Sequence, residues 1–251
     1  MAAPKRKIDP VTDTVNIAVA NVFSNLRTVK TPEIALSKKL KLNTRLKMDG
    51  LDFLSQIPED SISVAFFDPQ YRGILDKMKY GNEGKSRGRE RCELPQMTED
   101  TIREFAKGID RILIPSGHLF LWIDKFHLCQ GFESWFAETN MDVVDMITWN
   151  KKKMGMGYRT RRCAEYLIVL QTLPRKAKGV WKIHNICDVW DEPLAKRNGH
   201  AHRKPVDLQS ELISAVSNEG DVIVDPAAGS FSVMEAAKNS RRNFLGCDIN
   251  G

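Results

Sequence analysis

Hydrophobic positions along this chain fall into short apolar runs separated by segments of helical spacing. The six residues from Ile62 to Phe67 are almost all apolar, which is typical of a strand buried on both faces of a parallel sheet. A shorter run ends near Met48, and comparable runs cover residues 118–123, 143–149, 165–171, 221–225 and 243–248. The pattern therefore predicts about seven strands.

Amphipathic segments lie between most of these runs. Residues 51–57 present one apolar face, and Thr98 is suited to cap the helix that follows it. Further helices are expected over residues 128–136, after Pro205, and from residue 231 to about 239. Strands that alternate with helices predict an α/β fold with a doubly wound, mostly parallel seven-stranded sheet.

The alternation fails between residues 143–149 and 165–171, where no helical spacing separates the two strands. We therefore expect an antiparallel hairpin with a basic tip at the edge of the sheet. Residues 172–200 also break the pattern, and a small inserted recognition region is expected there. Residues 1–41 are interpreted as an N-terminal extension, with a helix docked on the main body or on a second subunit, and residues 42–251 as the main domain.

Bulk properties narrow the class of protein. The length of 251 residues suits about one α/β domain, and no apolar stretch approaches the length of a membrane span. No apolar segment follows the basic residues near the N-terminus, so they do not form a secretory signal. The five cysteines lie far apart without a C-x-x-C pair, and His200, His202 and one cysteine make a poor metal-ligand set. We expect a cytoplasmic protein with reduced thiols, no membrane association and no metal.

Basic residues outnumber acidic ones, 38 against 32, and the net charge of +6 favours a polyanionic partner. Three basic loops, at residues 85–91, 151–162 and 175–178, flank the same expected edge of the sheet. One such loop alone is explained by a solvated surface, whereas three together favour nucleic acid. The candidate phosphate-binding residues are Lys85, Arg87, Arg89, Lys151, Lys152, Arg159, Arg161 and Arg162.

The buried run at residues 62–67 ends in Asp68-Pro69-Gln70-Tyr71. Ligands of open α/β sheets bind at the carboxyl ends of the strands, so Asp68 stands where a site is expected. Its carboxylate and the Pro69 carbonyl are two fixed acceptors beside the Tyr71 ring, which suits a planar base bearing an amino group. Taken alone, an Asp-Pro pair after a strand is more often an ordinary turn.

A second constellation lies near the C-terminus, where a strand runs into the turn Asp225-Pro226-Ala227-Ala228-Gly229-Ser230 and a later strand ends in Asp248. Such a βαβ unit suits an adenosine-like ligand, because the glycine admits close approach, the helix N-terminus is positive, and the terminal acid binds ribose hydroxyls. The turn is not a G-x-G-x-x-G loop. Since Asp225 would repel phosphate and attract a cation, a sulfonium cofactor with an amino-acid tail fits it.

These elements resemble those of the S-adenosylmethionine-dependent DNA amino-methyltransferases, in particular the circularly permuted β group. In that family a catalytic Asp-Pro-Pro-Tyr precedes a cofactor-binding Asp-Pro-x-x-Gly-Ser-Gly, and here residues 68–71 precede residues 225–231 in the same order. His202-Arg203-Lys204-Pro205 is similar to the family's His-x-Lys-Pro element, and residues 149–151 and 161–165 are similar to its late edge-strand elements. The resemblance covers residues 42–251 and implies a Rossmann-like methyltransferase domain.

The resemblance also implies roles for single residues. Asp68, Pro69 and Tyr71 would bind the reacting base, and Asp248 and Asp49 would lie at the ribose and near the adenine of the cofactor. The cofactor-binding residues that it implies are Asp49, His202, Lys204, Asp225, Pro226, Gly229, Ser230, Phe231 and Asp248. An alternative for His202 and Lys204 is that they cap the helix at Pro205.

Two positions depart from the family pattern. Gln70 replaces the second proline, so the turn is less stiff and gains a backbone donor, although both acceptors remain. Phe231 replaces a glycine, and its ring packs either on the cofactor or on the following helix. We expect activity to survive, with slower turnover or a shifted substrate as the alternative.

The implied function is transfer of a methyl group from S-adenosylmethionine to N6 of a flipped-out adenine in DNA, because Asp at the first motif position is typical of the adenine enzymes. The alternatives are cytosine N4 or RNA as the substrate, and a catalytically silent subunit that binds nucleic acid. The short insert predicts a short or relaxed target sequence, or a homodimer that shares its recognition surface. A cognate restriction enzyme is a further candidate partner.

Overall fold

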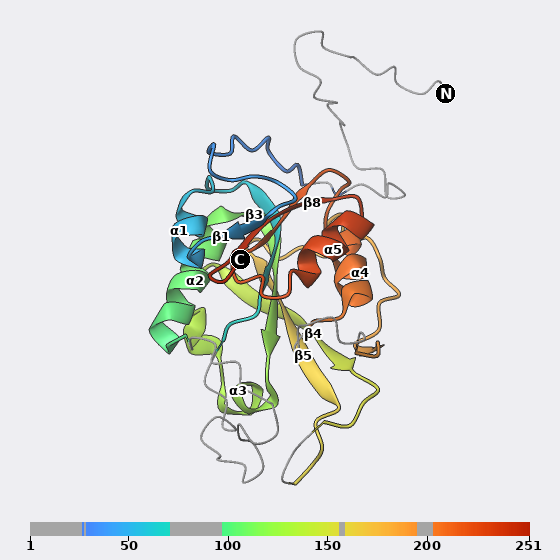
Figure 1. Cartoon of the computed structure of the whole chain (residues 1–251). Helices are drawn as coiled ribbons and strands as arrows, with labels where there is room; N and C mark the ends of the chain where they lie inside the picture. The colour runs from blue at the N-terminus through green and yellow to red at the C-terminus, as the bar shows by residue number, and fades with distance from the viewer. Residues whose placement is uncertain (1–26, 28, 71–96, 156–158, 195–202) are drawn as a thin grey trace, which may run out of the picture.

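One mixed sheet organises the structure, a computed structural model that describes residues 27, 29–70, 97–155, 159–194 and 203–251 (Figure 1). Within these residues the sheet has eight strands in the order β1-β8-β7-β2-β3-β5-β4-β6. The strands are β1 (Arg45–Lys47), β2 (Ile62–Phe67), β3 (Leu113–Ile123), β4 (Met141–Asn150), β5 (Ala164–Thr172), β6 (Val189–Asp191), β7 (Val222–Asp225) and β8 (Asn243–Asp248).

Helices cover both faces of the sheet. The first face carries α1 (Gly50–Ser55) and α2 (Glu99–Ile112), and the second carries α4 (Val206–Val216) and α5 (Ser232–Asn239) (Figure 1). A short helix, α3 (Lys125–Gln130), follows β3. This arrangement confirms the doubly wound α/β fold predicted from the alternation of strands and helices.

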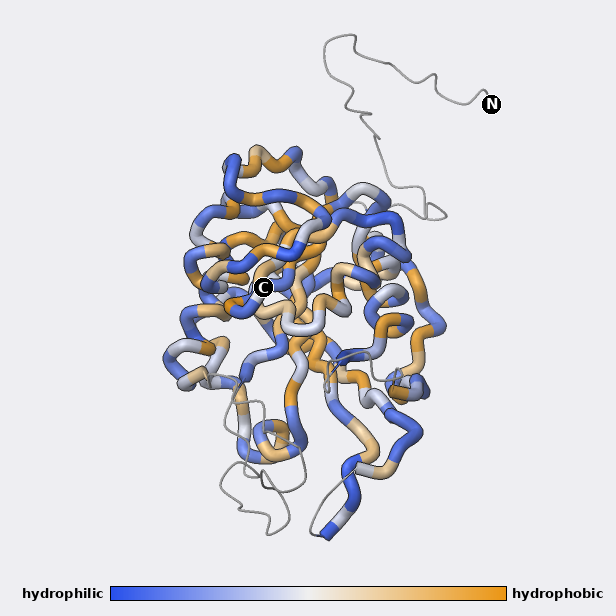
Figure 2. The backbone as a smooth tube through the Cα atoms, viewed as in Figure 1, coloured by the Kyte–Doolittle hydropathy of each residue, from blue (hydrophilic) through white to orange (hydrophobic). Residues whose placement is uncertain are grey.

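Strand β2 shows why the sequence folds in this way. All six of its residues are buried, with Ala65 and Phe67 in the hydrophobic cluster beneath α1 and α2, and Val64 and Phe66 in the cluster beneath α4 and α5. Successive side chains of a strand point to opposite faces, so a strand between two helical layers is apolar at nearly every position, and Ser63, the one polar residue of β2, hydrogen-bonds to Asp221. Figure 2 accordingly shows the hydrophobic residues gathered along the central strands, with hydrophilic residues in the loops around them.

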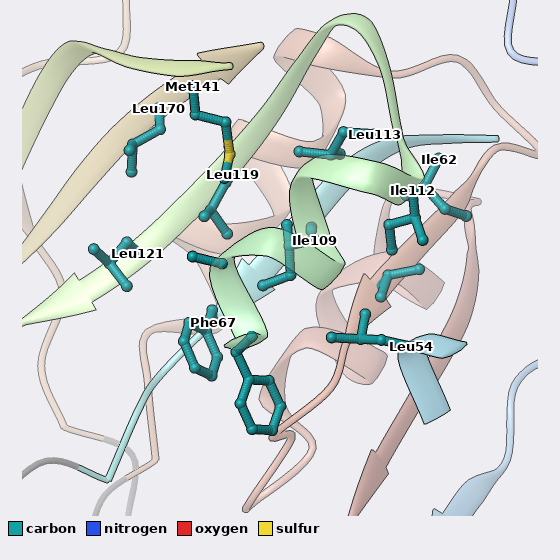
Figure 3. Close-up of a cluster of buried hydrophobic side chains, with 14 of the residues drawn as sticks. Leu54, Ile62, Phe67, Ile109, Ile112, Leu113, Leu119, Leu121, Met141 and Leu170 are labelled. Carbon is teal, nitrogen blue, oxygen red and sulfur yellow. The ribbon is translucent and has the colours of Figure 1, made fainter. Parts of the chain in front are cut away.

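Phe67, the residue before Asp68, is locked into the first of these clusters (Figure 3). Its ring stacks on that of Phe105 with 5.0 Å between centroids, and Ile109 of α2 and Leu121 of β3 belong to the same cluster. Full burial of a phenylalanine side chain stabilises a fold by roughly 1.5–3 kcal/mol. Packing at Phe67 therefore fixes where the chain emerges from the sheet at Asp68.

The sheet differs from the prediction at its far edge. β5 is antiparallel to both β3 and β4, as expected for a hairpin, but β4 is not the outermost strand. The short β6 pairs in parallel with residues 148–150 of β4, which raises the count from seven strands to eight. The segment at residues 181–190 shows only weak strand character, and a strand of three residues between polar segments is too short to be counted from periodicity.

A second difference concerns residues 128–136, for which one helix was predicted. α3 ends at Gln130, Gly131 adopts φ +98°, and a 3₁₀ turn follows at Glu133–Trp135. The positive φ suits glycine and interrupts the helix, although Trp135 is buried as expected. Elsewhere the helix signals are confirmed, because the Thr98 hydroxyl accepts a hydrogen bond from Thr101 N at the start of α2.

The described part of the N-terminal extension lies against the main body. The guanidinium of Arg27 donates to the Ser116 carbonyl (2.7 Å), and Leu40 is buried in the cluster beneath α1 and α2. The helix predicted within residues 15–26 lies outside the described residues. No helix among the described residues is long and apolar enough to cross a membrane.

Candidate active site

The two acidic turns predicted from the sequence meet at one edge of the sheet. β2 and β7 are parallel neighbours, with Ala65 opposite Val224, so their carboxyl ends point the same way. Asp68 follows the end of β2 and Asp225 is the last residue of β7. Pro69 is buried and the side chain of Asp68 is 30% exposed. An acceptor pair and a buried carboxylate thus stand side by side on adjacent strands.

Asp225 carries the buried carboxylate of this edge. Only 5% of the residue is exposed, and its Oδ1 accepts a hydrogen bond from Ala227 N (3.1 Å). Burial raises the pKa of Asp225 to about 8, and the negative charges of Asp68 and Asp248 act in the same direction. A cation placed beside Asp225 would relieve this cost, which is the behaviour expected of a site for a cationic ligand.

The turn after β7 is fixed to the neighbouring strand β8. Ala228 N donates to the Cys247 carbonyl (2.9 Å), and Gly229 N donates to Asp248 Oδ2 (3.1 Å). Gly229 has φ +48°, a conformation that favours glycine, and a side chain added there would meet nothing within 4 Å. Pro226 is buried and Ser230 half-buried in the same turn. The turn therefore leaves open space in front of an ordered backbone.

Asp49 and Asp248 come together as the circular permutation implies. β1 and β8 are parallel neighbours, with Lys47 opposite Asp248, so the two acids follow adjacent strand ends. Asp49 also caps α1, because its carboxylate accepts hydrogen bonds from the first-turn amides. A Cβ on Gly50 would lie 2.5 Å from the Pro226 carbonyl oxygen, so only glycine lets α1 begin this close to the turn at residues 225–230.

Phe231 packs into the core. Only 3% of the residue is exposed, its ring meets that of Phe244 edge-on with 6.1 Å between centroids, and the Arg45 guanidinium lies 5.1 Å from the ring centroid. Its backbone is left-handed, at φ 57° and ψ 34°. A glycine would adopt this conformation without strain, which explains the glycine of the family pattern in physical terms.

Lys204 connects Asp68 with strand β5, a contact that the sequence alone does not predict. Its Nζ lies 3.0 Å from Asp68 Oδ2 and 2.9 Å from Glu165 Oε2. Lys151 Nζ contacts the other oxygen of Glu165 at 2.6 Å. Burial disfavours the Lys204 ammonium, but the two carboxylates outweigh it and raise the Lys204 pKa.

Glu165 was not among the residues predicted to form the site. It lies at the start of β5, opposite Trp149 of β4, and within an element that had been matched only to an edge strand. Burial acts to raise the pKa of Glu165, whereas Lys204 and Lys151 lower it to about 2. The sequence signal that could have identified it is a charged residue near the start of a mostly apolar strand.

The predicted phosphate-binding residues do not all behave alike. Arg159 and Arg161 are exposed, and Lys152 is exposed and pairs with Asp191 (2.7 Å). Lys151 instead points to Glu165, and its side chain is only 15% exposed. The guanidinium of Arg162 lies 5.6 Å from the centroid of the Phe126 ring. The tip of the hairpin therefore mixes exposed and inward-facing basic groups.

Five predicted site residues fall outside the described residues. One follows Gln70, three belong to the first basic loop, and one precedes α4. They are Tyr71, Lys85, Arg87, Arg89 and His202. Their roles stay predictions. Among the residues that the structure describes, no group of three or more His, Cys, Asp or Glu side chains is placed to hold a metal ion.

Comparison with solved structures supports the fold. The structure matches the crystal structure of the M1.HpyAVI complex with SAM at a TM-score of 0.57 and 18% identity, over 82% of this chain and 92% of the other. It matches PvuII DNA methyltransferase, a cytosine-N4-specific enzyme, at a TM-score of 0.63 and 15% identity, over 85% and 86% of the two chains. At these identities the likeness establishes the fold.

Sequence comparison establishes the family. The profile of a DNA methylase family, N6_N4_Mtase, matches residues 62–251. Type II methyltransferase M.HhaII of Haemophilus parahaemolyticus is 54% identical over 209 residues, which cover 83% of this chain and 91% of that protein. Type II methyltransferase M1.MboII of Moraxella bovis is 26% identical over 84% of this chain and 93% of its own length. This chain therefore belongs to the N6/N4 DNA methylase family and is a DNA methyltransferase.

Proposed function

We propose that this protein transfers a methyl group from S-adenosylmethionine to the exocyclic N6 of an adenine in DNA. The observation that carries the proposal is the placement of Asp68 and Pro69 at the end of β2, beside Asp225 at the end of β7. This arrangement sets the acceptors for an amino group next to the buried carboxylate of the cofactor turn. A methyl acceptor and a methyl donor can thus meet at one edge of the sheet.

The chain's own residues supply orientation and charge. The adenine amino nitrogen is a weak nucleophile because its lone pair is delocalised into the ring. Hydrogen bonds to the Asp68 carboxylate and the Pro69 carbonyl favour a pyramidal nitrogen and offset the positive charge that develops on it. Asp68 also provides a route for the departing proton. The target base must leave the duplex, at a cost of roughly a few kcal/mol, and we place the Tyr71 ring against it.

The residues around the second turn fit the cofactor by their chemistry. S-adenosylmethionine supplies an electrophilic methyl group on a sulfonium, and it carries a cationic amine and ribose hydroxyls. Asp225 is buried with no ion pair among the described residues, so it suits a cation. The open space before Gly229 and the carboxylates of Asp248 and Asp49 suit an adenosine. We assign Pro226, Ser230 and Phe231 to shaping this turn.

Adenine is favoured over cytosine by the aspartate at the first motif position. DNA adenine methyltransferase YhdJ of Escherichia coli is 40% identical over 68 residues, a quarter of this chain, which supports the same choice. Cytosine N4 remains the second candidate, because a cytosine-N4-specific enzyme shares the fold. Both bases present an exocyclic amino group, so the same two acceptors serve either one.

The proposed partners follow from the relatives. DNA is the substrate of the family, and relatives named Type II methyltransferases support a cognate restriction enzyme acting at the same target sequence. The short segment at residues 172–200 supports a short target, or a homodimer that shares its recognition surface. We place the protein in the cytoplasm, where its DNA substrate and reduced cysteines would both be found.

Nucleoside mass spectrometry tests the proposed reaction. Unmethylated plasmid DNA is incubated with the protein and S-adenosylmethionine, digested to nucleosides and compared with a reaction that lacks cofactor. We expect N6-methyladenine only in the complete reaction. N4-methylcytosine would select the second candidate, and methylation of total RNA but not of DNA would overturn the choice of substrate.

A further inference from the structure

Four charged side chains form a continuous row from the hairpin to the catalytic motif. Lys151 Nζ is 2.6 Å from Glu165 Oε1, Glu165 Oε2 is 2.9 Å from Lys204 Nζ, and Lys204 Nζ is 3.0 Å from Asp68 Oδ2. The signs alternate and the row is neutral as a whole. Both oxygens of Glu165 are therefore used to hold ammonium groups, and one of these groups is shared with Asp68.

Two buried tryptophans fix the position of this row. Lys204 Nζ lies 5.0 Å from the centroid of the Trp122 ring, and Lys151 Nζ lies 5.6 Å from that of Trp149. The two rings pack edge to face at 5.9 Å, and each residue is at most 2% exposed. The Lys204 ammonium therefore contacts the carboxylates of Asp68 and Glu165 and lies near the Trp122 ring.

Backbone contacts fix the Trp149 side of this tryptophan pair. The indole of Trp149 donates to the Glu192 carbonyl (2.7 Å), and Trp149 is the antiparallel partner of Glu165. Sheet register therefore places Glu165 beside Trp149, independently of the loop that carries Lys204. A carboxylate on a central strand is a more rigid anchor for an ammonium than a carboxylate on a turn.

We propose that Glu165 is a positioning residue, which acts through Lys204 to fix the Asp68 carboxylate for methyl transfer. The proposal rests on the function proposed above and adds a residue to it. By sharing the Lys204 ammonium, Glu165 keeps it from pairing with Asp68 alone. Lys204 keeps Asp68 ionised, and Glu165 holds Lys204 in place, so Asp68 is oriented yet remains a strong acceptor for the amino group of the base.

Among the described residues, three charged side chains near Asp68 bear on its ionisation. Lys204 precedes α4 and favours the ionised form, whereas Glu165 on β5 and Asp225 on β7 disfavour it. Lys151 acts mainly on Glu165. Loss of the Lys204 charge must therefore raise the pH at which Asp68 ionises, and loss of the Glu165 charge must lower it. These shifts report the charges at Asp68, and a fall in kcat at unchanged KM and Kd distinguishes a positioning role from a purely structural one.

The test compares Glu165→Gln and Lys204→Met with the wild-type protein and with Glu219→Gln. Glu219 pairs with Arg241 across an exposed 3.3 Å contact, which makes it a matched control. The ionisation of Asp68 is followed by carbon-13 NMR of labelled aspartate carboxyls, with Asp68→Asn to assign the signal. The second readout is the pH profile of kcat for DNA methylation, with KM for DNA and Kd for S-adenosylmethionine measured in parallel.

For Lys204→Met we expect the Asp68 titration to move to higher pH, and for Glu165→Gln we expect it to move to lower pH. In Glu165→Gln we expect kcat to fall by between about tenfold and a hundredfold, with KM and Kd changed by less than about twofold. In Lys204→Arg, which keeps the charge, the Asp68 titration stays near that of the wild type. Glu219→Gln should match the wild type in every readout.

The proposal is overturned if both charge-removing variants leave the Asp68 titration in place, or if Lys204→Met abolishes cofactor binding without moving it. Lys204 would then be a ligand of the cofactor. The NMR readout does not depend on turnover. If the titrations shift as expected while the wild-type protein methylates no DNA, the positioning of Asp68 stands and the proposed function fails.

Discussion

The ionisable groups at the carboxyl edge of the sheet have pKa values pushed in opposite directions. Asp225 is an acid whose pKa burial raises to about 8, and Glu165 is an acid whose pKa two ammonium groups lower to about 2. Asp225 has no such counter-ion among the described residues. A carboxylate that is costly to ionise in the free protein fits a role in binding a cation.

This difference predicts how stability depends on pH. The carboxyl of Asp225 titrates near pH 4 when unfolded and near pH 8 when folded, so its contribution to the free energy of unfolding falls as pH rises between these values. Asp225→Asn can keep the hydrogen bond from Ala227 N without the buried charge. We expect it to exceed the wild type by at least about 1 kcal/mol at pH 9.

Urea unfolding of wild-type protein and Asp225→Asn at pH 5 and pH 9, without cofactor, measures this effect. The advantage of the variant should shrink at pH 5, where both side chains are neutral in the folded state. An advantage that is larger at pH 5 than at pH 9 would contradict the raised pKa. The variant should also bind S-adenosylmethionine more weakly if Asp225 receives its cationic part.

The positions of the acidic residues could be predicted from sequence more readily than the contacts of the basic ones. Asp68, Asp225 and Asp248 follow apolar runs, so strand prediction alone places them at one edge. Lys151 was assigned to the phosphate backbone because it begins a basic loop, yet it faces Glu165. A one-dimensional charge pattern cannot tell which way a lysine of a hairpin points, because that depends on strand register.

At the scale of elements, the turn into α5 holds a conformation that its residue does not favour. Phe231 has φ 57° but buries its ring against Phe244. Loss of a buried phenylalanine ring costs about 3–5 kcal/mol, and a non-glycine residue in the left-handed region costs about 1–2 kcal/mol. Packing in the core therefore outweighs the strain that the departure from glycine introduces.

The strain at residue 231 predicts an unusual order of stability among its variants. Phe231→Gly and Phe231→Ala both lose the ring, but only glycine removes the strain, so we expect the glycine variant to be more stable by about 1 kcal/mol. At exposed Lys238 in the same helix the order should reverse, with alanine more stable than glycine by about 1 kcal/mol. Urea unfolding of the four variants tests both orders, and alanine equalling or exceeding glycine at residue 231 would contradict the account.

Elements were predictable from sequence where their signal was long and regular. The buried strand at residues 62–67, the Thr98 cap and the strand that ends at Asp225 agree with prediction. α3 is broken by the positive φ of Gly131, and β6 is three residues long. Gly131 is a local helix-ending signal, whereas β6 depends on a tertiary contact that a local pattern does not contain, because a short strand forms only when its partner is in place.

At the scale of the whole molecule, the sheet gathers the site from distant parts of the chain. β8 lies between β1 and β7, so Asp49 and Asp248 meet although 199 positions separate them in number (248 − 49). Of the described strands, β1 comes first in the sequence and β8 last, and the two acids lie at the carboxyl ends of these neighbouring strands. The turn after β2 likewise lies beside the turn after β7, although β7 comes much later in the sequence.

The central claim is that Asp68, at the end of β2, performs the methyl transfer chemistry for a cofactor held beside Asp225. The most direct test is a single-turnover measurement of labelled methyl transfer from S-adenosylmethionine to DNA, with wild-type protein, Asp68→Asn and Asp68→Ala. Asp145→Asn, which alters an exposed carboxylate on β4, serves as the matched control. Cofactor Kd is measured for each protein.

We expect both Asp68 variants to transfer methyl groups at least about a hundredfold more slowly, because one preorganised hydrogen-bonding partner of the reacting nitrogen is lost. Cofactor affinity should stay within about twofold of the wild type, and Asp145→Asn should react at the wild-type rate. An Asp68 variant that binds cofactor and transfers methyl groups to DNA at the wild-type rate would contradict the account.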